Sequence, residues 1–254
     1  MIKTKHLLSK IYYIPLAFCS VVIISCNQNT SDNKGEAATT KEPVLHELTS
    51  ETAIDTLTAF GAQNNDSIAV ISTRLGDMKV RLFKDTPLHR ANFVRLTKSG
   101  YYNQGEFFRV VEGFAIQGGD SDNRTMKQGS YRIPQEVTPA HIHKKGALAM
   151  ARYGDERNPE KESSSNNFYL VQGKVRTLDE IRAYEAQKNI KYTPEQIEAY
   201  TTIGGEPSLD QEYTVFGEVI EGIEVIDKIA AEPVTSQNWP QEIVKHQIRI
   251  TNKY

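Results

Sequence analysis

The sequence predicts a mainly β protein whose strands close into a barrel or pack as a sandwich. Three observations support this fold class: the chain contains many short β-rich runs, glycine, proline or polar clusters bound them, and few segments show helical spacing. The last run, residues 244–250, alternates apolar and polar side chains and is a natural partner for the first strand of a closed barrel. We therefore expect one folded domain over residues 66–254.

The predicted domain begins with a hairpin and a helix. Residues 67–73 and 78–83 are β-rich, and a short connection containing a glycine joins them. Thr86 and Pro87 then provide an N-cap and a first-turn proline for an amphipathic helix, which Gly100 ends. Further strands are expected at 106–111, 114–117, 146–151, 167–172 and 213–219, and a second amphipathic helix at 221–231.

One segment, residues 174–206, departs from this β pattern. Thr177 and Glu180, and then Thr193 and Gln196, have the spacing of a capping box, in which two side chains satisfy backbone N–H groups at the start of a helix. Two helices are therefore expected, the second ending before the glycine pair that follows it. The sequence predicts a helical hairpin inserted into a β domain.

The amino terminus is typical of an export signal. Three lysines precede an apolar run at 11–24, which is short for a membrane-spanning helix. Residues 23–26, Ile-Ile-Ser-Cys, resemble the lipobox of bacterial lipoproteins. This resemblance implies cleavage before Cys26 and acylation of its thiol and new amino group. An uncleaved signal anchor with incidental cysteines is the alternative.

The chain between this signal and the domain is predicted to be a tether. The polar stretch after Cys26 holds too few apolar side chains to offset the entropy lost on ordering. Residues 44–60 carry some apolar character and leave a short helix open, although no strong cap supports one. We therefore divide this part into a signal peptide, residues 1–25, and a lipidated cysteine with a flexible tether, residues 26–65.

Charge and cysteine content exclude several classes of partner. The formal net charge is −2 and no long lysine or arginine run occurs, so the sequence offers no electrostatic basis for binding nucleic acid. Both cysteines, Cys19 and Cys26, precede the folded domain. Neither a disulfide framework nor a cysteine metal site is expected within it.

A run at residues 107–120 carries the strongest functional signal. It reads Phe-Phe-Arg-Val-Val-Glu-Gly-Phe-Ala-Ile-Gln-Gly-Gly-Asp and resembles the cyclophilin signature Phe-His-Arg-Val-Ile-x-x-Phe-Met-x-Gln-Gly-Gly-Asp. Segments at 146–151, 166–171 and 209–217 resemble the same family in the same order. Tyr213 stands where many eukaryotic members have histidine, which resembles the bacterial branch. The chain is thus identified as similar to cyclophilin-type peptidyl-prolyl cis/trans isomerases.

The resemblance implies an eight-stranded antiparallel barrel, capped by two helices, with a proline-binding groove on its outer face. It implies that Arg109 is the catalytic arginine, and that no cofactor or metal ion is needed. The implied substrate-binding residues are Phe114, Ala115, Phe168 and Leu209 in the proline pocket, Gln117, Ala151 and Arg152 in the groove that holds the peptide backbone, and Asn167 and Tyr213 as further positions.

The chemistry of X-Pro rotation suits these residue types. The barrier is ~18 to 20 kcal/mol because the amide nitrogen lone pair is delocalised, and no bond breaks, so no nucleophile is required. A guanidinium can hydrogen-bond the prolyl carbonyl and nitrogen more strongly in the twisted transition state than in either planar state. Without the resemblance, Arg109 would be interpreted as an exposed strand arginine, and Phe114, Phe168 and Leu209 as core.

Four positions depart from the family pattern. Ala115 replaces a methionine, which leaves a roomier proline pocket with a weaker grip. Asn167 replaces a glutamine and loses one methylene of reach. Ser208 stands where some members carry tryptophan, which predicts weak cyclosporin binding. Arg152 replaces a common asparagine, although the backbone contact expected there does not depend on the side chain.

Other combinations of polar residues carry weaker signals. His141 and His143 share a face at a spacing of two and would suit a metal, but no third ligand is evident, so we favour solvated loop histidines. Asp120 and Asp122 lack the glycine and distal glutamate of a calcium loop. The serines at 163–165 lack the context of a hydrolase nucleophile. No metal is predicted.

The predicted function is therefore an isomerase for X-Pro bonds that assists folding of exported proteins at the bacterial cell envelope. Its partners are proline-containing polypeptides, with no nucleic acid, and Cys26 attaches a monomer to a membrane, with the domain in the periplasm or on the cell surface. The alternative is a lipid-tethered chaperone or interaction module with little turnover, in which residues 174–206 supply the partner surface. Ala115 and Asn167 keep this alternative open.

Overall fold

The structure is a computed structural model that describes residues 45–251, so the predicted signal peptide and Cys26 lie outside the described residues. Its α-helices are α1 (Ser50–Gln63), α2 (Pro87–Lys98), α3 (Leu178–Lys188), α4 (Pro194–Thr202) and α5 (Glu224–Ala230). Short 3-10 helices occupy Tyr101–Gln104 and Pro207–Leu209. The strands are β1 (Leu48–Thr49), β2 (Ile68–Thr73), β3 (Gly76–Leu82), β4 (Glu106–Phe107), β5 (Arg109–Val111), β6 (Ala115–Gly118), β7 (Gly129–Ser130), β8 (Arg132–Ile133), β9 (Ala147–Met150), β10 (Ser163–Ser164), β11 (Phe168–Val171), β12 (Val215–Glu221) and β13 (Val244–Ile250).

Nine of these strands form one antiparallel sheet in the order β4-β13-β2-β3-β12-β9-β11-β6-β5. β4 and β5 stand at opposite ends of this order, yet only Phe108 separates them in the chain. The backbone N–H of Glu106 in β4 also donates to the carbonyl of Asp120, just after β6, at 3.0 Å. The sheet therefore curls into a nearly closed barrel. Because β4 and β5 are two parts of one stretch, the expected eight-stranded architecture is confirmed.

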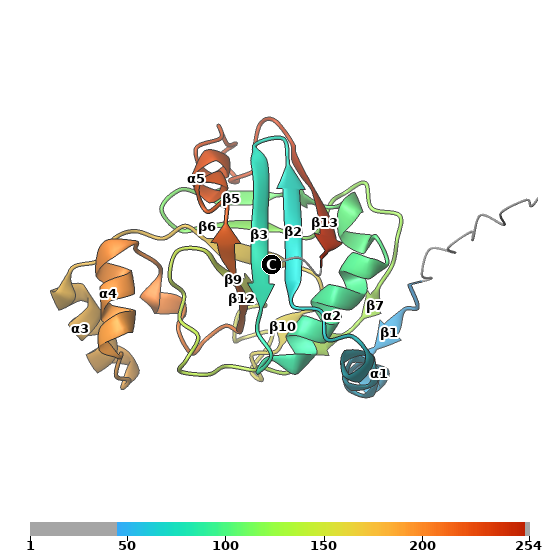
Figure 1. The fold of residues 1–254 in the computed structure, drawn as a ribbon, viewed down its shortest axis with the longest axis horizontal. Helices are drawn as coiled ribbons and strands as arrows, with labels where there is room; N and C mark the ends of the chain where they lie inside the picture. Colours follow the sequence, from blue (N-terminus) through green and yellow to red (C-terminus); the bar gives the residue numbers. More distant parts are fainter. Residues whose placement is uncertain (1–44, 252–254) are drawn as a thin grey trace, which may run out of the picture. The chain divides into compact units, whose positions relative to one another are not determined.

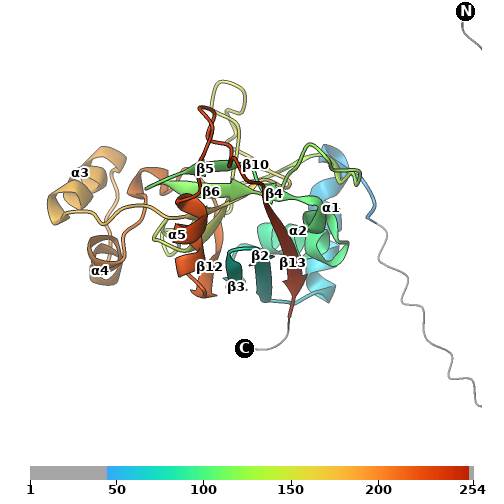
Figure 2. The same cartoon turned by 90° about the horizontal axis from the view of Figure 1, so that it is seen from above.

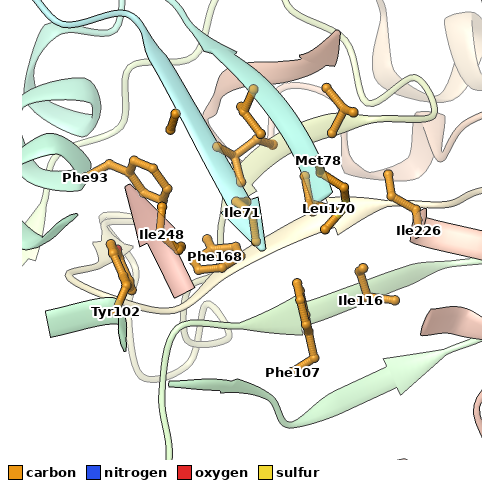
Figure 3. Packing of buried hydrophobic residues seen from close by; sticks show 14 of the residues in the cluster. Ile71, Met78, Phe93, Tyr102, Phe107, Ile116, Phe168, Leu170, Ile226 and Ile248 are labelled. Atoms are coloured by element: carbon orange, nitrogen blue, oxygen red, sulfur yellow. The ribbon is translucent and has the colours of Figure 1, made fainter. Parts of the chain in front are cut away.

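The barrel closes as the alternating sequence patterns predict. The hairpin of β2 and β3 forms, and the last strand β13 pairs with β2, with Ile248 opposite Ile71. Along β3 the side chains from Asp77 to Leu82 alternate between solvent and a buried face, as the two-residue period of a strand requires. The buried faces meet in one apolar core, and Figure 3 shows Ile71, Phe107 and Phe168 among the side chains that fill it.

Helices α2 and α5 pack onto this core and confirm the two predicted capping helices. Phe93, Val94 and Leu96 of α2 are fully buried, as are Ile226 and Ile229 of α5. Together they cover the core from different sides of the hairpin strands (Figure 1).

The start of α2 differs from the sequence prediction in its cap. The Thr86 side chain makes no capping bond. Instead, the carboxylate of Glu136 accepts the N–H groups of Leu88 and His89, each at 2.9 Å. Glu136 follows β8 and meets the helix only in the folded state. A helix N-terminus attracts negative charge, which explains why a distant carboxylate replaces the local hydroxyl.

Residues 45–65 are not part of a flexible tether, which corrects the predicted boundary. β1 pairs with β7, and α1 packs on α2 beside it. The helix begins with a capping box between Thr49 and Thr52, and it buries Ala53 and Leu57 completely. These two side chains join a small apolar cluster with Tyr131, so the segment gains a partner surface that only the folded barrel provides.

The insertion forms the predicted helical hairpin beside the barrel (Figures 1 and 2). Both capping boxes are present, at Thr177 with Glu180 and at Thr193 with Gln196. A separate apolar cluster joins the hairpin to the barrel through Tyr200 and Ile142. Within residues 45–251, no helix has the length and apolar character needed to span a bilayer.

Candidate active site

The register of the sheet places the predicted site residues in a row across four strands. Arg109 of β5 is the Cα partner of Gln117 in β6, which is the partner of Tyr169 in β11, and Tyr169 in turn faces Ala149 of β9. Directly paired residues point to the same side of a sheet. Their neighbours in the chain, such as Ile116, fill the core, so this row lies on the outer face of the barrel.

A cavity of about 240 Å³ opens on this face. It is small for a ligand site, and its size suits a single side chain held beside its backbone. Eight of the residues predicted from the sequence line it, together with one that was not predicted, Tyr169. The lining residues are Arg109, Phe114, Ala115, Gln117, Ala151, Arg152, Tyr169, Leu209 and Tyr213.

Phe168 does not line this cavity, in contrast to the sequence prediction. Its side chain is fully buried in the barrel core, where its ring lies 5.9 Å from that of Phe93 and 5.5 Å from that of Tyr102 (Figure 3). Successive strand residues point to opposite faces, so the next residue, Tyr169, takes the place in the pocket wall. Tyr169 is the Cα partner of Gln117, so the register between β6 and β11 is the signal that places it on the outer face.

Arg109 is exposed at the rim of the pocket. Within residues 45–251 its guanidinium makes no ion pair or hydrogen bond, and its contact is with the ring of Phe114, 6.0 Å from the guanidinium carbon. An always-charged fork of donors that the protein leaves unpaired is available to a bound ligand. The arrangement fits the predicted catalytic role of Arg109.

Arg152, by contrast, is fully engaged within the protein. Its side chain is 5% exposed, donates to the carbonyl of Glu212 at 2.9 Å and pairs with the carboxylate of Asp155 at 2.5 Å. Its guanidinium carbon also lies 4.6 Å from the centre of the Tyr213 ring. Arg152 therefore supports the Tyr213 wall of the pocket from the protein side.

Asn167 lies beside the pocket without lining it. Its carbonyl accepts the N–H of Ala151, a lining residue, at 2.8 Å. Its side-chain Oδ1 is buried and has no hydrogen-bond partner among the described residues. A buried acceptor without a donor is costly, by about 1 to 3 kcal/mol.

The two histidines considered as metal ligands have different surroundings. His141 bonds the carboxylate of Asp85 at 2.8 Å and stacks on Phe83 at 3.9 Å. His143 is fully buried, which corrects the expectation of a solvated loop histidine. Its Nδ1 lies 2.8 Å from a carboxylate oxygen of Asp210 and its Nε2 lies 2.9 Å from the hydroxyl of Tyr169. Sequence reasoning missed this contact because the three residues are far apart in the chain.

Ser163 lies in a chain of contacts that resembles a hydrolase triad. Its hydroxyl is 2.8 Å from Nε2 of His89, and Nδ1 of that ring is 2.6 Å from Glu136. Ser163 is only 1% exposed, and Glu136 at the same time caps α2. No substrate could reach this hydroxyl, so the contacts among Ser163, His89 and Glu136 stabilise the fold.

The barrel carries on its outer face a pocket with walls from Phe114, Leu209 and Tyr213 and with Arg109 at its rim, as the resemblance drawn from the sequence implies. The chain belongs to the cyclophilin-type peptidyl-prolyl cis-trans isomerase family, because the family model described as "Cyclophilin type peptidyl-prolyl cis-trans isomerase/CLD" matches residues 68–252. The resemblance drawn from the sequence is confirmed, and the chain is an enzyme of this type.

Known proteins support this assignment. A Staphylococcus epidermidis protein provisionally named a peptidyl-prolyl cis-trans isomerase is 34% identical over 182 residues, which cover 70% of this chain and 88% of the relative. Peptidyl-prolyl cis-trans isomerase-like 3 of Dictyostelium discoideum is 32% identical over 186 residues, covering 71% and 92%. A crystal structure of a Cryptosporidium parvum cyclophilin-type isomerase shares the fold, with a TM-score of 0.56 at 22% identity, covering 74% of this chain and 99% of that one.

Proposed function

We propose that this isomerase acts on X-Pro bonds of exported proteins at the bacterial cell envelope, attached to a membrane by a lipid on Cys26. The observation that carries the catalytic part is the guanidinium of Arg109, which makes no ion pair or hydrogen bond within residues 45–251, at the rim of a pocket with walls from Phe114, Leu209 and Tyr213. The observation that carries the location is the charged and apolar amino terminus that ends in a lipobox-like Cys26.

The geometry supports separate roles for the pocket walls, which would bind the proline ring, and for Arg109, which would hydrogen-bond the twisting amide. The aromatic and aliphatic walls supplied by Phe114, Leu209 and Tyr213 suit a proline ring. Arg109 would then donate to the prolyl carbonyl and to the nitrogen as it becomes pyramidal, contacts that strengthen only as the bond twists. A Cryptosporidium parvum cyclophilin-type isomerase with the same fold, a TM-score of 0.53 and 24% identity, was crystallised in the presence of the dipeptide Ala-Pro, which supports an X-Pro ligand.

The pocket lining also includes a polar group that suits a peptide backbone. Gln117 lies between Arg109 and Tyr169 in the same row and lines the pocket. Its amide suits the N–H and C=O groups that flank a proline. The substrate class we propose is therefore an extended polypeptide rather than a free amino acid.

The location is tested by comparing two cysteine variants of the full chain in bacteria fed a labelled fatty acid. Wild type and Cys19→Ser should incorporate the label and fractionate with membranes, whereas Cys26→Ser should do neither. Protease added to cells with a permeabilised envelope should digest the domain. Absence of label from the wild type, or a domain protected from the protease, would contradict the proposal.

A second candidate function is favoured by one surface of the insertion. Val175, Leu178 and Ile203 are 60%, 50% and 48% exposed, and the backbone of Val175 lies against Gly204, the residue after Ile203. Exposed apolar side chains on neighbouring segments are typical of protein contact surfaces. They support a chaperone or interaction role for the lipid-tethered domain, with or without turnover.

This candidate is tested with unfolded chains that contain no proline. If the insertion binds them, the full-length protein suppresses their aggregation, and replacing Val175, Leu178 and Ile203 by serine abolishes the effect. Ile54→Ser, which changes an equally exposed residue on α1, is the matched control. An inactive wild type in this assay rules the second candidate out.

A further inference from the structure

The insertion is connected to the proline pocket by a buried hydrogen-bond network. Its centre is Asp210, which is 2% exposed and directly follows the pocket residue Leu209. One carboxylate oxygen accepts the backbone N–H of His143 at 2.7 Å and its Nδ1–H at 2.8 Å. The other accepts the hydroxyls of Tyr192 at 2.7 Å and Tyr200 at 2.5 Å. We call these four residues, with Tyr169, the pocket network.

At one end the pocket network reaches the wall of the active site. Nε2 of His143 lies 2.9 Å from the hydroxyl of Tyr169, and the two rings are nearly parallel. Burial raises the pKa of Tyr169 well above its ordinary value, so the phenol keeps its proton and can donate it to the ring. Tyr213, another wall residue, packs edge-on against both rings. The orientation of Tyr169 is therefore fixed from behind the pocket.

At the other end the network depends on the insertion. Tyr200 belongs to α4, and Tyr192 lies in the connection between α3 and α4. Burial raises the pKa of both phenols, so each remains a donor to Asp210. Phenylalanine would fill the same apolar space, so the hydroxyls serve the carboxylate rather than the packing.

The need for these hydroxyls follows from the burial of Asp210. A carboxylate withdrawn from water is stable only when donors surround it. Here two of the four donors to the carboxylate come from the insertion. Lys188 of α3 also donates, at 2.9 Å, to the backbone carbonyl of Asp210. The insertion thus permits a buried charge immediately behind two pocket walls.

We propose that the insertion, residues 174–206, holds the walls of the proline pocket in position. Its two tyrosines hold Asp210, and through it His143, so that Tyr169 and Leu209 keep the positions that grip the substrate. The two tyrosines, Asp210 and His143 are positioning residues, because none of them touches the reacting bond. The inference rests on the family's isomerase activity and not on the proposed envelope location.

The test compares kcat and KM of the full chain on a short Ala-Pro peptide. The double variant Tyr192→Phe/Tyr200→Phe removes only the two donors, and we expect KM to rise about threefold to tenfold with kcat within about twofold of wild type, because substrate binding is weakened while Arg109 is untouched. Tyr184→Phe, on α3 and without a bond to the network, is the matched control and should leave both constants unchanged.

Two further variants separate positioning from loss of stability. Tyr169→Phe should raise KM by a similar factor, and combining it with the double variant should add little, since all three changes break one network. Ser163→Ala, whose hydroxyl bonds His89 and no lining residue, should lower the melting temperature without changing KM. A folded double variant with wild-type KM, or a fully additive triple variant, overturns the proposal. Should the double variant fail to fold, a wild-type KM in both Tyr192→Phe and Tyr169→Phe overturns it instead.

Discussion

Two buried chains of contacts in this enzyme use the same chemistry for different ends. In the first, which we call the helix network, Glu136 holds His89, and His89 holds the hydroxyl of Ser163. In the pocket network, Asp210 holds His143, and His143 holds the hydroxyl of Tyr169. The two residues differ in position, because Ser163 joins β10 to α2 inside the protein whereas Tyr169 lines the candidate site.

A carboxylate, a histidine and a hydroxyl in line do not by themselves define a function. Similar distances produce a hydrolase triad only where a substrate reaches the hydroxyl. In the helix network the carboxylate is also occupied by two N–H groups of α2, so it serves the fold. In the pocket network the carboxylate of Asp210 accepts two hydroxyls from the insertion. Its partner His143 bonds Tyr169, which lines the pocket, so this network supports the site.

The largest effect on activity is expected from Arg109, which belongs to neither network. Arg109→Ala should lower kcat/KM by about 100- to 1,000-fold, the range typical of removing one donor aimed at a transition state. The melting temperature should stay at the wild-type value, because the guanidinium makes no hydrogen bond or ion pair within residues 45–251. Arg109→Lys should restore little, since an ammonium lacks the planar fork. An Arg109→Ala enzyme with full activity would place the catalytic group elsewhere.

The next largest effect is expected from Asp210→Asn in the pocket network. Four donors would face an amide, and breaking a buried charged network of this kind costs about 3 kcal/mol of unfolding free energy. The remaining folded protein should also show a raised KM, because Tyr169 and Leu209 lose their support. Urea unfolding and peptide kinetics on the same sample measure both effects. A loss of stability with unchanged kinetics would make the two networks equivalent.

A smaller effect is expected from Glu136→Gln in the helix network. The amide keeps one acceptor but loses the charge that caps α2, so we expect about 2 kcal/mol less unfolding free energy. Here kcat and KM per folded molecule should not change. A kinetic defect in this variant would show that the helix network also affects the pocket.

The smallest effect concerns His246, a third buried histidine that has no carboxylate partner among the described residues. Burial lowers its pKa to about 3, so the folded protein keeps this ring neutral where the unfolded chain, with an ordinary pKa of about 6.5, takes up a proton. Stability must therefore fall as pH drops below about 6.5, by at most about 1.4 kcal/mol per pH unit from this group.

Urea unfolding between pH 7 and pH 5 checks this expectation. His246→Gln should be less stable at pH 7 but should show a shallower decline toward pH 5 than wild type. An equally steep decline would assign the acid sensitivity to other groups.

The parts of this fold that depend on neighbouring residues were predictable. The hairpin of β2 and β3 follows from strand alternation, and both helices of the insertion follow from capping boxes whose members are three residues apart. The pairing of the first and last strands followed from the need to close a barrel. Each of these signals is contained in a short piece of sequence or in a general rule of topology.

The parts that were missed depend on partners distant in the chain. α1 has a local capping box but is stabilised by the surface of α2, and the cap of α2 is Glu136, 48 residues away from Leu88. His143 was interpreted as a solvated loop residue because its partner Asp210 is 67 residues distant. Eight of the nine lining residues were predicted from the family resemblance, and the misassigned wall residue came from choosing the wrong face of β11.

The near closure of the barrel has a consequence for a protein that handles other polypeptides. An open sheet presents a row of unpaired N–H and C=O groups, to which any extended chain can add itself as another strand. In this enzyme residues 106–111 contribute to both ends of the sheet order, and the N–H of Glu106 donates to the carbonyl of Asp120 where the two ends meet. We therefore expect a polypeptide substrate to contact the groove through its side chains rather than by adding a strand to the sheet.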